Sequence, residues 1–247
     1  MKLAAFSHKG FVRERNEDCA LVPPAILQSA SEDIMVREGP FTWLAVADGL
    51  GGHARGDLAS RTVLSALMRE SQPFQSKEDL NELSAYLGDS LAEEARKTSR
   101  ARSMATTLTA FHISEDTLHL IHCGDCRAFD VSQKKLLTVD HTLVFANYLR
   151  GELSLEEVRN HPMKSRLLRC LQAMEGLVEM DLKTMPLNPG RRYLLASDGI
   201  WEAMTMEILL DLAAGKDIEQ AAQAIRTEYL ESGARDNGTL ILFENQP

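Results

Sequence analysis

The sequence predicts an α+β fold in which helices cover antiparallel sheets. Short β-rich segments and amphipathic helical segments both occur, and they do not alternate strictly as they do in βαβ proteins. Two helical segments lie between groups of strands, and two more precede the final strand. Because no repeat, low-complexity tract or linker divides the 247 residues, we expect a single domain over residues 1–247.

The predicted strands are apolar or β-branched segments of strand length, several of which end at Gly or Asp. In chain order they are Lys2–Ser7, Phe41–Ala47, Ala105–His112, Thr117–His122, Arg127–Val131, Val178–Thr184, Tyr193–Ser197 and Thr239–Glu244. The predicted helices are segments in which apolar residues recur at spacings of three and four, as Leu80, Leu83 and Leu87 do. They are Gly56–Ser71, Lys77–Ser99, Ile200–Ala214 and Asp217–Ser232.

Residues 140–176 differ from the segments around them. They contain many Arg and Glu residues, three short helical patterns and few strand signals. We interpret them as a flap inserted over the surface, which could act as a lid. An ordinary pair of packing helices fits the same pattern equally well.

The composition argues against several classes of protein. Lys and Arg number 27 and Asp and Glu number 36, for a net charge of −9, whereas a nucleic-acid or anionic-membrane binder needs a basic face. No run of about 18 apolar residues is present, so no membrane insertion is expected. The first residues lack the apolar stretch of a secretory signal, and four cysteines do not make a disulfide framework in a chain of this length. We therefore expect a cytoplasmic protein.

Acidic residues repeatedly lie beside apolar strand segments. One such acid alone is usually a turn former or a helix cap, but several in one chain favour a shared site. Asp48 and Asp198 stand in Asp-Gly pairs directly after a strand. Glu17 and Asp18 precede a short strand, Asp125 lies between two strands, and Asp236 precedes the last strand.

If the strands share one sheet system, these carboxylates converge and need a counter-charge. Oxygen-only ligands select hard cations such as Mg²⁺ or Mn²⁺, and their scatter through the chain excludes an EF-hand. Gly49 lets the backbone approach a metal, with its carbonyl as a ligand. A metal pair lowers the pKa of a water held between the ions, which suits in-line attack on a phosphate ester. Arg13 could then grip the phosphate oxygens with its planar fork.

The motifs resemble one known family in order and content. They are RERNED, VADGLGGHARGD, SMATTLTA, HCGDCRAF, LTVDHTLV, LLASDGIWE and RDNGTLILF. Together they resemble the bacterial branch of the metal-dependent Ser/Thr protein phosphatases, the PPM or phosphatase 2C-like family, from about Gly10 to Phe243. The resemblance implies a sandwich of two antiparallel sheets with helices on both outer faces.

The resemblance also implies a role for each acid. Asp48 would bridge two metal ions, and the Gly49 carbonyl would bind one of them. Asp198 and Asp236 would complete the site of the first ion. The ligands of the second ion, acting directly or through water, would be Glu17 and Asp18.

Further residues match other positions of the family. Asp125 would hold a weaker third ion together with Asp198, and Arg13 would bind the phosphate. Asn237 and Thr239 would orient Asp236. Residues 140–176 would be the variable flap that borders the active site and influences substrate choice. Arg166 and Arg169 could contribute to that choice, although an exposed charged face is the more plausible account of these two arginines.

The sequence departs from the family at several positions. Eukaryotic members carry a histidine, proposed as the general acid, where this chain has Leu50; bacterial members usually have an apolar residue there too. The proton donor is therefore unassigned, and for His53 a structural or helix-capping role is more plausible than catalysis. The serine that commonly follows Asp125 is Cys126 here.

Cys126 creates a C-x-x-C spacing with Cys123, so zinc and redox functions need consideration. A Cys₄ zinc site would need a second pair, but Cys19 and Cys170 are isolated. A thioredoxin-like motif should open a helix, whereas strands are predicted on both sides here. We interpret both cysteines as ordinary small residues beside a metal ligand. The histidines that we interpret as packing or flap residues are His122, His141 and His161.

The predicted function is hydrolysis of phosphoserine and phosphothreonine in proteins, by direct attack of a metal-bridging water, with two Mn²⁺ or Mg²⁺ ions and a possible third. The alternatives are an inactive regulatory module on the same fold and a haloacid-dehalogenase-type phosphatase. The latter needs a D-x-D motif, which neither Asp48 nor Asp198 begins. The expected partners are phosphorylated proteins, namely a cognate Ser/Thr kinase and its substrates, and we expect a signalling enzyme that acts as a monomer.

Overall fold

The computed structural model describes residues 1–247 except 29–32, 51–54, 71–75, 98–103, 174–176 and 247. Within these residues the strands form two six-stranded antiparallel sheets and one two-stranded pair. The strands are β1 (Lys2–His8), β2 (Asp18–Val22), β3 (Ala25–Leu27), β4 (Met35–Glu38), β5 (Trp43–Asp48), β6 (Ala105–Thr106), β7 (Leu108–Ser114), β8 (Thr117–Cys123), β9 (Arg127–Asp130), β10 (Lys135–Leu136), β11 (Leu171–Gln172), β12 (Asp181–Pro186), β13 (Arg192–Ala196) and β14 (Gly238–Glu244).

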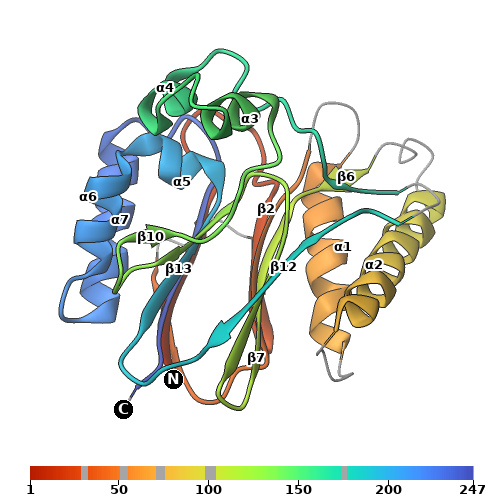
Figure 1. Ribbon diagram of the computed structural model, residues 1–247, viewed down its shortest axis with the longest axis horizontal. Coiled ribbons are helices and arrows are strands. Elements are labelled where there is room, and N and C mark those ends of the chain that lie inside the picture. Colours follow the sequence, from red (N-terminus) through yellow and green to blue (C-terminus); the bar gives the residue numbers. More distant parts are fainter. Residues whose placement is uncertain (29–32, 51–54, 71–75, 98–103, 174–176, 247) are drawn as a thin grey trace.

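The helices of the described residues are α1 (Gly56–Arg69), α2 (Lys77–Lys97), α3 (Leu143–Leu149), α4 (Leu155–Asn160), α5 (Asp198–Ala203), α6 (Met206–Ala213) and α7 (Ile218–Glu231). The first sheet has the strand order β10-β9-β13-β14-β1-β4, and the second has the order β12-β8-β7-β5-β2-β3. Figure 1 shows the two sheets face to face, with α6 and α7 outside the first and α1 and α2 outside the second. The predicted α+β sandwich is therefore confirmed.

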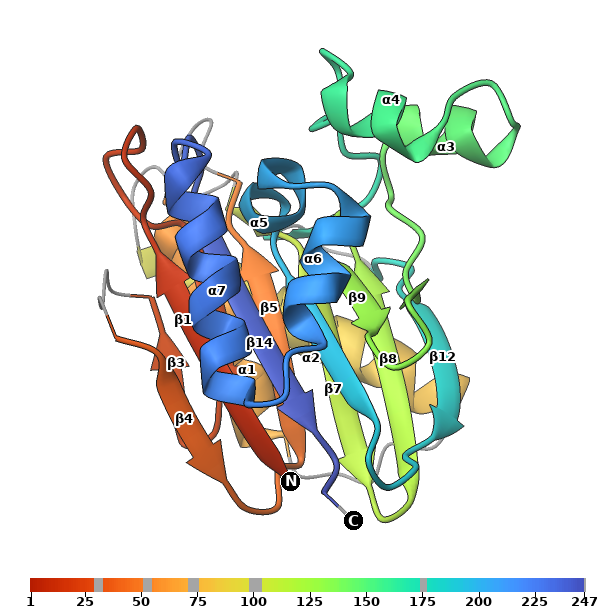
Figure 2. The same cartoon turned by 90° about the vertical axis from the view of Figure 1, so that its left-hand side faces the viewer.

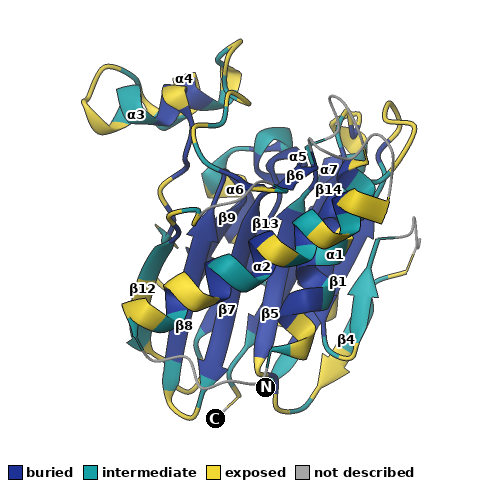
Figure 3. Ribbon diagram, turned by 90° about the vertical axis from the view of Figure 1, so that its right-hand side faces the viewer, coloured by how far each residue is buried: buried dark blue, intermediate teal, exposed yellow. Residues whose placement is uncertain are grey.

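Each sheet is buried on both faces, by the other sheet on one side and by helices on the other. Side chains of successive residues in a strand point to opposite sides, so neighbouring residues enter different cores. In β1, Leu3 and Ala5 face the core between the sheets, whereas Ala4 and Phe6 face the core under α6 and α7. Figure 2 shows α6 and α7 lying across the outer face of the first sheet. Figure 3 shows α1 and α2 lying across the outer face of the second sheet, with the strands beneath them buried. This double burial explains why the strands read as continuous apolar runs in the sequence.

Aromatic rings join the two sheets in the middle of the sandwich. Tyr193 of β13 stacks on Phe243 of β14 with ring centroids 5.2 Å apart. Phe111 of β7, in the other sheet, meets Phe243 edge-on at 5.5 Å. Such pairs stabilise beyond the area that they bury, by about 0.5–1.5 kcal/mol each. They keep the two sheets in register and so fix the position of the loops at their ends.

Several element boundaries differ from the prediction. The helix expected over Ile200–Ala214 is two helices, because Thr205 ends α5 and caps α6, accepting a hydrogen bond from the Ile208 N–H at 3.3 Å. The strand expected over Ala105–His112 is interrupted between β6 and β7, and the strand expected over Val178–Thr184 begins only at Asp181.

The flap contains α3 and α4 in its described part, residues 140–173, and not three helices. The two helices pack on each other through a small apolar cluster of Val144, Phe145 and Val158. Figure 2 shows them at one end of the molecule, beyond the ends of the sheets. A packed pair of helices is therefore present, as the second interpretation of this segment expected, and the third helical pattern was wrong because residues 161–170 form turns and irregular backbone.

None of the helices in the described residues combines the length and the apolar character that crossing a bilayer requires.

Candidate functional site

The predicted acids come from both sheets and meet at one end of the sandwich. β2 and β5 run antiparallel, and their register places Asp18 directly opposite Asp48. Asp125 occupies the turn between β8 and β9, and Asp236 precedes β14. Asp198 is the first residue of α5 and so begins a helix, where we had placed it at a strand end. The Glu17 carboxylate lies beside Gly56 at the start of α1, where a Cβ added to the glycine would lie 2.9 Å from its Oε1.

The backbone around Asp48 is held by two threonines. The Asp48 N–H donates to the Thr107 hydroxyl at 2.9 Å, and the Asp48 carbonyl accepts from the Thr107 N–H and the Thr106 hydroxyl, both at 2.8 Å. These bonds leave the Asp48 carboxylate free to face the other acids. The Thr-Thr pair lies in the SMATTLTA motif, but no local sequence pattern indicates that it holds the Asp48 backbone.

Two glycines permit close backbone approaches at the site. A Cβ added at Gly49 would lie 2.0 Å from the Gly56 carbonyl oxygen, and one at Gly199 would lie 1.9 Å from the Asn237 carbonyl oxygen. No side chain fits at such separations. The glycine after each aspartate is therefore required for the loops to pack, besides any role for a carbonyl as a ligand.

The carboxylates raise one another's pKa values. Burial and the neighbouring charges of Asp198 and Asp18 raise the pKa of Asp48 well above its usual value. Burial, Asp125 and Glu202 do the same to the pKa of Asp198. Burial raises the pKa of Asp18 to about 7, although the Ser197 hydroxyl donates to its carboxylate at 2.6 Å. Together these shifts describe an anionic centre that lacks a matching positive charge.

Asp125 supplies an independent sign that a cation belongs here. Its Oδ1 atom is buried and has no hydrogen-bond partner among the described residues. Burial, followed by the charges of Asp140 and Glu202, raises the pKa of Asp125 to about 7. Buried polar atoms in proteins are nearly always paired, so an orphaned carboxylate oxygen in an acidic centre fits an ion. The donor set, oxygen only, fits Mg²⁺ or Mn²⁺.

The carboxylates do not form a complete set of ligands around one ion position. In the part of the chain that the structure describes, no three His, Cys, Asp or Glu side chains are close enough together to hold one ion. The acids are thus gathered within electrostatic reach of each other but not in a coordination shell. Their mutual repulsion gives a physical reason for that separation.

Arg13 is a cation at the rim of this centre. Its Nη2 donates to Asp236 Oδ2 at 2.6 Å, and this contact is the main cause that raises the pKa of Arg13. The Arg13 side chain is 53% exposed, so it lies on the rim of the site with part of its fork open to solvent. This position agrees with the predicted contact to a phosphate, whereas the ion pair with Asp236 was not foreseen.

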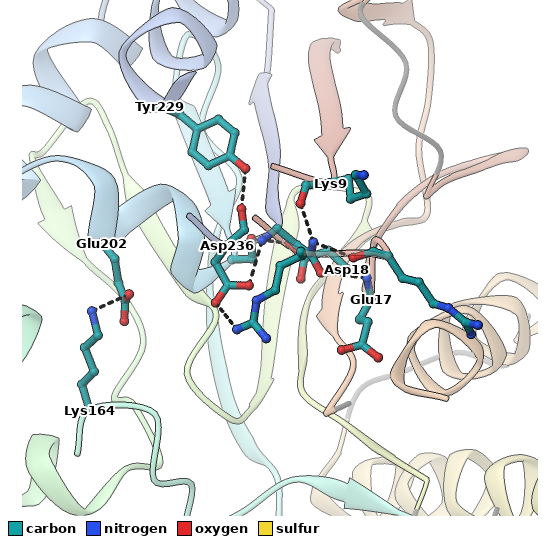
Figure 4. A network of polar contacts seen from close by, with 11 residues as sticks. Lys9, Glu17, Asp18, Lys164, Glu202, Tyr229 and Asp236 are labelled. Atoms are coloured by element: carbon teal, nitrogen blue, oxygen red, sulfur yellow. Dashed lines mark hydrogen bonds and ion pairs between the residues drawn. The ribbon is translucent and has the colours of Figure 1, made fainter. Parts of the chain in front are cut away.

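Asn237 fastens the loop that carries Arg13 and Glu17. Its side-chain amide donates to the carbonyls of Lys9 at 2.7 Å and Arg15 at 2.9 Å, and its Oδ1 accepts from the Glu17 N–H at 2.8 Å. Only its backbone N–H reaches the Asp236 carboxylate. The predicted role of orienting Asp236 therefore belongs to the backbone, and the side chain holds the loop. Figure 4 shows this network, with Tyr229 donating to the Asp236 carbonyl from α7.

A buried arginine that the sequence analysis had not selected supports Asp125. Arg127 forms a bidentate ion pair with Asp140, with the shortest contact at 2.8 Å, and both side chains are almost completely buried. Its guanidinium lies 3.6 Å from the ring centre of Trp201, whose Nε1 donates to the Asp125 carbonyl at 3.1 Å. On its other side lies Phe145 of the flap, at 5.8 Å. Arg127 thus contacts both the flap and the residue that holds Asp125.

The cysteines and histidines lie as the interpretation of them requires. Strands β8 and β9 flank the C-x-x-C segment, and all four cysteines, which lie in described positions, are free and buried. Burial raises the pKa of Cys126 well above its usual value, so its thiol is unreactive. His122 and His141 bond to protein groups, namely Thr109 and the Gly124 N–H. His53 lies outside the described residues.

The metal-free protein is expected to lose stability as the pH rises from 6.5 to 8. Asp18 and Asp125 have folded-state pKa values of about 7, above their unfolded values, so their contribution to stability is present at low pH and is lost as the pH passes 7. The expected loss is about 1–3 kcal/mol. The buried His122, with a pKa of about 3, changes stability only below pH 6.5.

Urea denaturation in EDTA at pH 6.5 and pH 8.0 measures this effect. Asp125→Asn serves as the control and should show a smaller loss. A metal-free protein that is equally stable at both values would contradict the raised pKa values.

Comparisons with known proteins agree with the fold and the motifs. The family profile described as protein phosphatase 2C matches residues 30–220. Serine/threonine phosphatase stp of Listeria welshimeri is 31% identical over 209 residues, which cover 81% of this chain and 82% of that protein. Serine/threonine protein phosphatase PstP of Mycobacterium tuberculosis is 30% identical over 249 residues, or 99% of this chain, and this chain spans 45% of its length.

Solved structures give the same result. The crystal structure of the Mycobacterium tuberculosis phosphatase PstP/Ppp superimposes with a TM-score of 0.82 at 28% identity, and each chain is covered completely. A structure of the catalytic domain of PstP in complex with two manganese ions superimposes with a TM-score of 0.80 at 26% identity.

Proposed function

Because this chain belongs to the protein phosphatase 2C family, we propose that it is a serine/threonine protein phosphatase that hydrolyses phosphoserine and phosphothreonine. The observation that carries the proposal is the convergence of four acids on one end of the sandwich, where the charges of Asp198, Asp18 and Asp125 all raise the pKa of Asp48. An unpaired anionic centre is unsuited to a dianionic substrate unless cations bind there first. The relatives named as Ser/Thr phosphatases support the same activity.

The proposed cofactors are two Mn²⁺ or Mg²⁺ ions, with a possible third at Asp125. Two manganese ions are bound in the related PstP structure. We propose as ligands the residues of the acidic centre together with the Gly49 carbonyl; the acids are Glu17, Asp18, Asp48, Asp125, Asp198 and Asp236. When bound, such ions lower the pKa of a coordinated water and neutralise the phosphate. The protein itself fixes the acids, excludes bulk water through the buried core and offers the Arg13 guanidinium at the rim.

The alternative of an inactive regulatory module has little support. Loss of catalysis should appear as replaced acids, yet each predicted ligand is present in the sequence. A structural role alone would also not favour an orphaned oxygen such as Asp125 Oδ1. The haloacid-dehalogenase alternative is wrong, because the chain belongs to a different family.

The proposal extends to the partners, the oligomeric state, the domain organisation and the compartment. We propose a cognate Ser/Thr kinase and its substrates as partners, a monomer as the active form, and one domain with residues 140–176 as its flap. Four free, buried cysteines are consistent with the cytoplasm as the compartment.

Hydrolysis of a phosphothreonine peptide by the purified protein, with Mn²⁺ and with EDTA, tests the proposal. Turnover with Mn²⁺ that stops in EDTA and returns when Mn²⁺ is restored is the expected result. Mn²⁺ binding measured by calorimetry separates the alternatives: a protein that neither binds Mn²⁺ nor hydrolyses the peptide is a scaffold.

Arg13→Ala is expected to raise KM for the phosphopeptide by about 10- to 100-fold, with a smaller change in kcat, because it removes charge-assisted hydrogen bonds to the phosphate. Arg13→Lys keeps the charge but not the fork and should give an intermediate KM. Steady-state kinetics at saturating Mn²⁺ measure both values. An unchanged KM for Arg13→Ala would show that Arg13 is only the partner of Asp236.

A further inference from the structure

A polar cleft of about 390 Å³ runs from the acidic centre along the base of the flap. Its lining includes Arg159 and Lys164 of the flap together with Arg235 and Asp236 before β14. Gly199 and Glu202 of α5 also line it. Because Asp236 belongs both to this cleft and to the predicted ligands, whatever occupies the cleft lies next to the reacting phosphate.

Cations exceed anions on the walls of this cleft. Lys164 pairs with Glu202 at 2.5 Å, and Asp236 is already paired with Arg13. Figure 4 shows Lys164 reaching across from the flap to Glu202. Arg235 is exposed and has no ion-pair partner among the described residues. Arg235 thus lines the cleft with its charge unpaired among the described residues, and Arg159 lines it while pairing with Glu156 outside the lining.

Arg159 provides a second observation. Its Nη2 pairs with Glu156 at 2.5 Å, and its Nη1 donates to the Glu202 carbonyl at 3.4 Å. Its Nε, however, is buried and has no hydrogen-bond partner within the described part of the chain. A buried guanidinium N–H without an acceptor is rare and costly. Because the Nε atom is buried, a ligand oxygen completes its hydrogen bonding only if the Arg159 side chain turns toward the cleft.

The flap arginines that we had considered for substrate choice do not line this cleft. Arg169 pairs with Asp181 of β12 at 3.3 Å and with Glu179 at 3.6 Å, and neither it nor Arg166 is among the residues that line the cleft. The flap cations that line the cleft are therefore Arg159 and Lys164. Both lie nearer to Asp236.

We propose that this cleft binds the segment of the phosphoprotein that flanks the phosphorylated residue, and that it selects acidic side chains there through Arg235 and Arg159. The inference rests on the proposed phosphatase function and names its substrate class. The net charge of −9 repels acidic peptides at long range. The selection must therefore come from contacts at short range within the cleft, inside the Debye length of about 8–10 Å.

Paired phosphothreonine peptides test the inference. They have the same length and carry either Glu or Gln at the positions flanking the phosphothreonine. The readout is the ratio of kcat/KM for the Glu peptide to that for the Gln peptide, since a ratio cancels effects on the chemistry itself. The wild-type ratio is expected to be about 5 to 10.

Two variants should change this ratio in opposite directions. Arg235→Glu reverses the exposed charge and should lower the ratio to about 1 or less. Glu202→Gln removes the partner of Lys164, frees a cation and should raise the ratio. Lys216→Glu makes the same charge change as Arg235→Glu at the far end of the first sheet, where its carbonyl accepts from Arg192. It should leave the ratio unchanged.

The outcomes separate this inference from the proposed function. A wild-type ratio near 1, or equal effects of Arg235→Glu and Lys216→Glu, would reject the cleft as the selective element. Failure to hydrolyse p-nitrophenyl phosphate as well as both peptides would reject the proposed function instead. In that case, fluorescence anisotropy of the labelled peptides in EDTA still tests the cleft, because a preference for Glu in binding needs no turnover.

Discussion

Asp198→Asn is expected to lower kcat/KM toward a phosphothreonine peptide by about a thousandfold or more, while the fold survives. Asp198 is the first residue of α5, and its pKa is raised by burial and by Asp125 and Glu202. An amide keeps the size and removes the charge that would attract a cation. The variant should therefore lose Mn²⁺ affinity as measured by calorimetry.

The stability of the same variant should change in the opposite direction. In EDTA at pH 7.5, removing one of several repelling carboxylates should raise the free energy of unfolding by about 1 kcal/mol. Asp89→Asn, on the exposed face of α2, makes the same chemical change away from the site and should alter neither property. Full activity in Asp198→Asn, or lower stability in EDTA, would remove Asp198 from the predicted ligand set.

Arg127→Ala is expected to reduce the free energy of unfolding by about 3–5 kcal/mol, which is the usual effect of leaving a buried charge without its partner. Asp140 would lose its bidentate contact while remaining 4% exposed, and Trp201 would lose the guanidinium that lies 3.6 Å from its ring. Urea denaturation in EDTA gives the value without a contribution from metal binding.

Two controls define the cause of that loss. Lys134→Ala breaks an exposed ion pair with Asp211 and should change the free energy of unfolding by less than about 1 kcal/mol. The double variant Arg127→Leu and Asp140→Leu removes both charges and should recover part of the loss. A loss below about 1 kcal/mol for Arg127→Ala alone would show that Asp140 finds other partners.

Most of the fold could be predicted because its strands and long helices have strong periodic patterns. The errors arise where a local signal interrupts a longer pattern. Thr205 lies within an apolar repeat that favours one helix, yet its hydroxyl caps α6 and splits the segment. Strands β3 and β4 were missed because they are short edge strands whose residues are only partly buried, so they lack a continuous apolar run.

The acids of the candidate site could be predicted because each lies next to an element with a clear pattern. The groups that hold those acids could not. Asn237 contacts Lys9 and Arg15 across more than 220 intervening positions, and no local pattern records such contacts. Arg127 reads as a charged residue beside a strand, and its burial depends on Asp140 and Trp201 together. Long-range pairing of polar side chains is fixed by the folded topology.

The pairing of β1 with β14 has a consequence for biosynthesis. These two strands are neighbours along their whole lengths, from Lys2 opposite Glu244 to His8 opposite Gly238. Arg13, Glu17 and Asp18 therefore leave the ribosome long before β14 and Asn237, which hold them in place, have been translated. Until then β1 lacks its β14 neighbour in the first sheet, and such unpaired edges invite chaperones or aggregation. The nascent polypeptide should thus have no phosphatase activity, and activity should appear only when β14 joins the sheet.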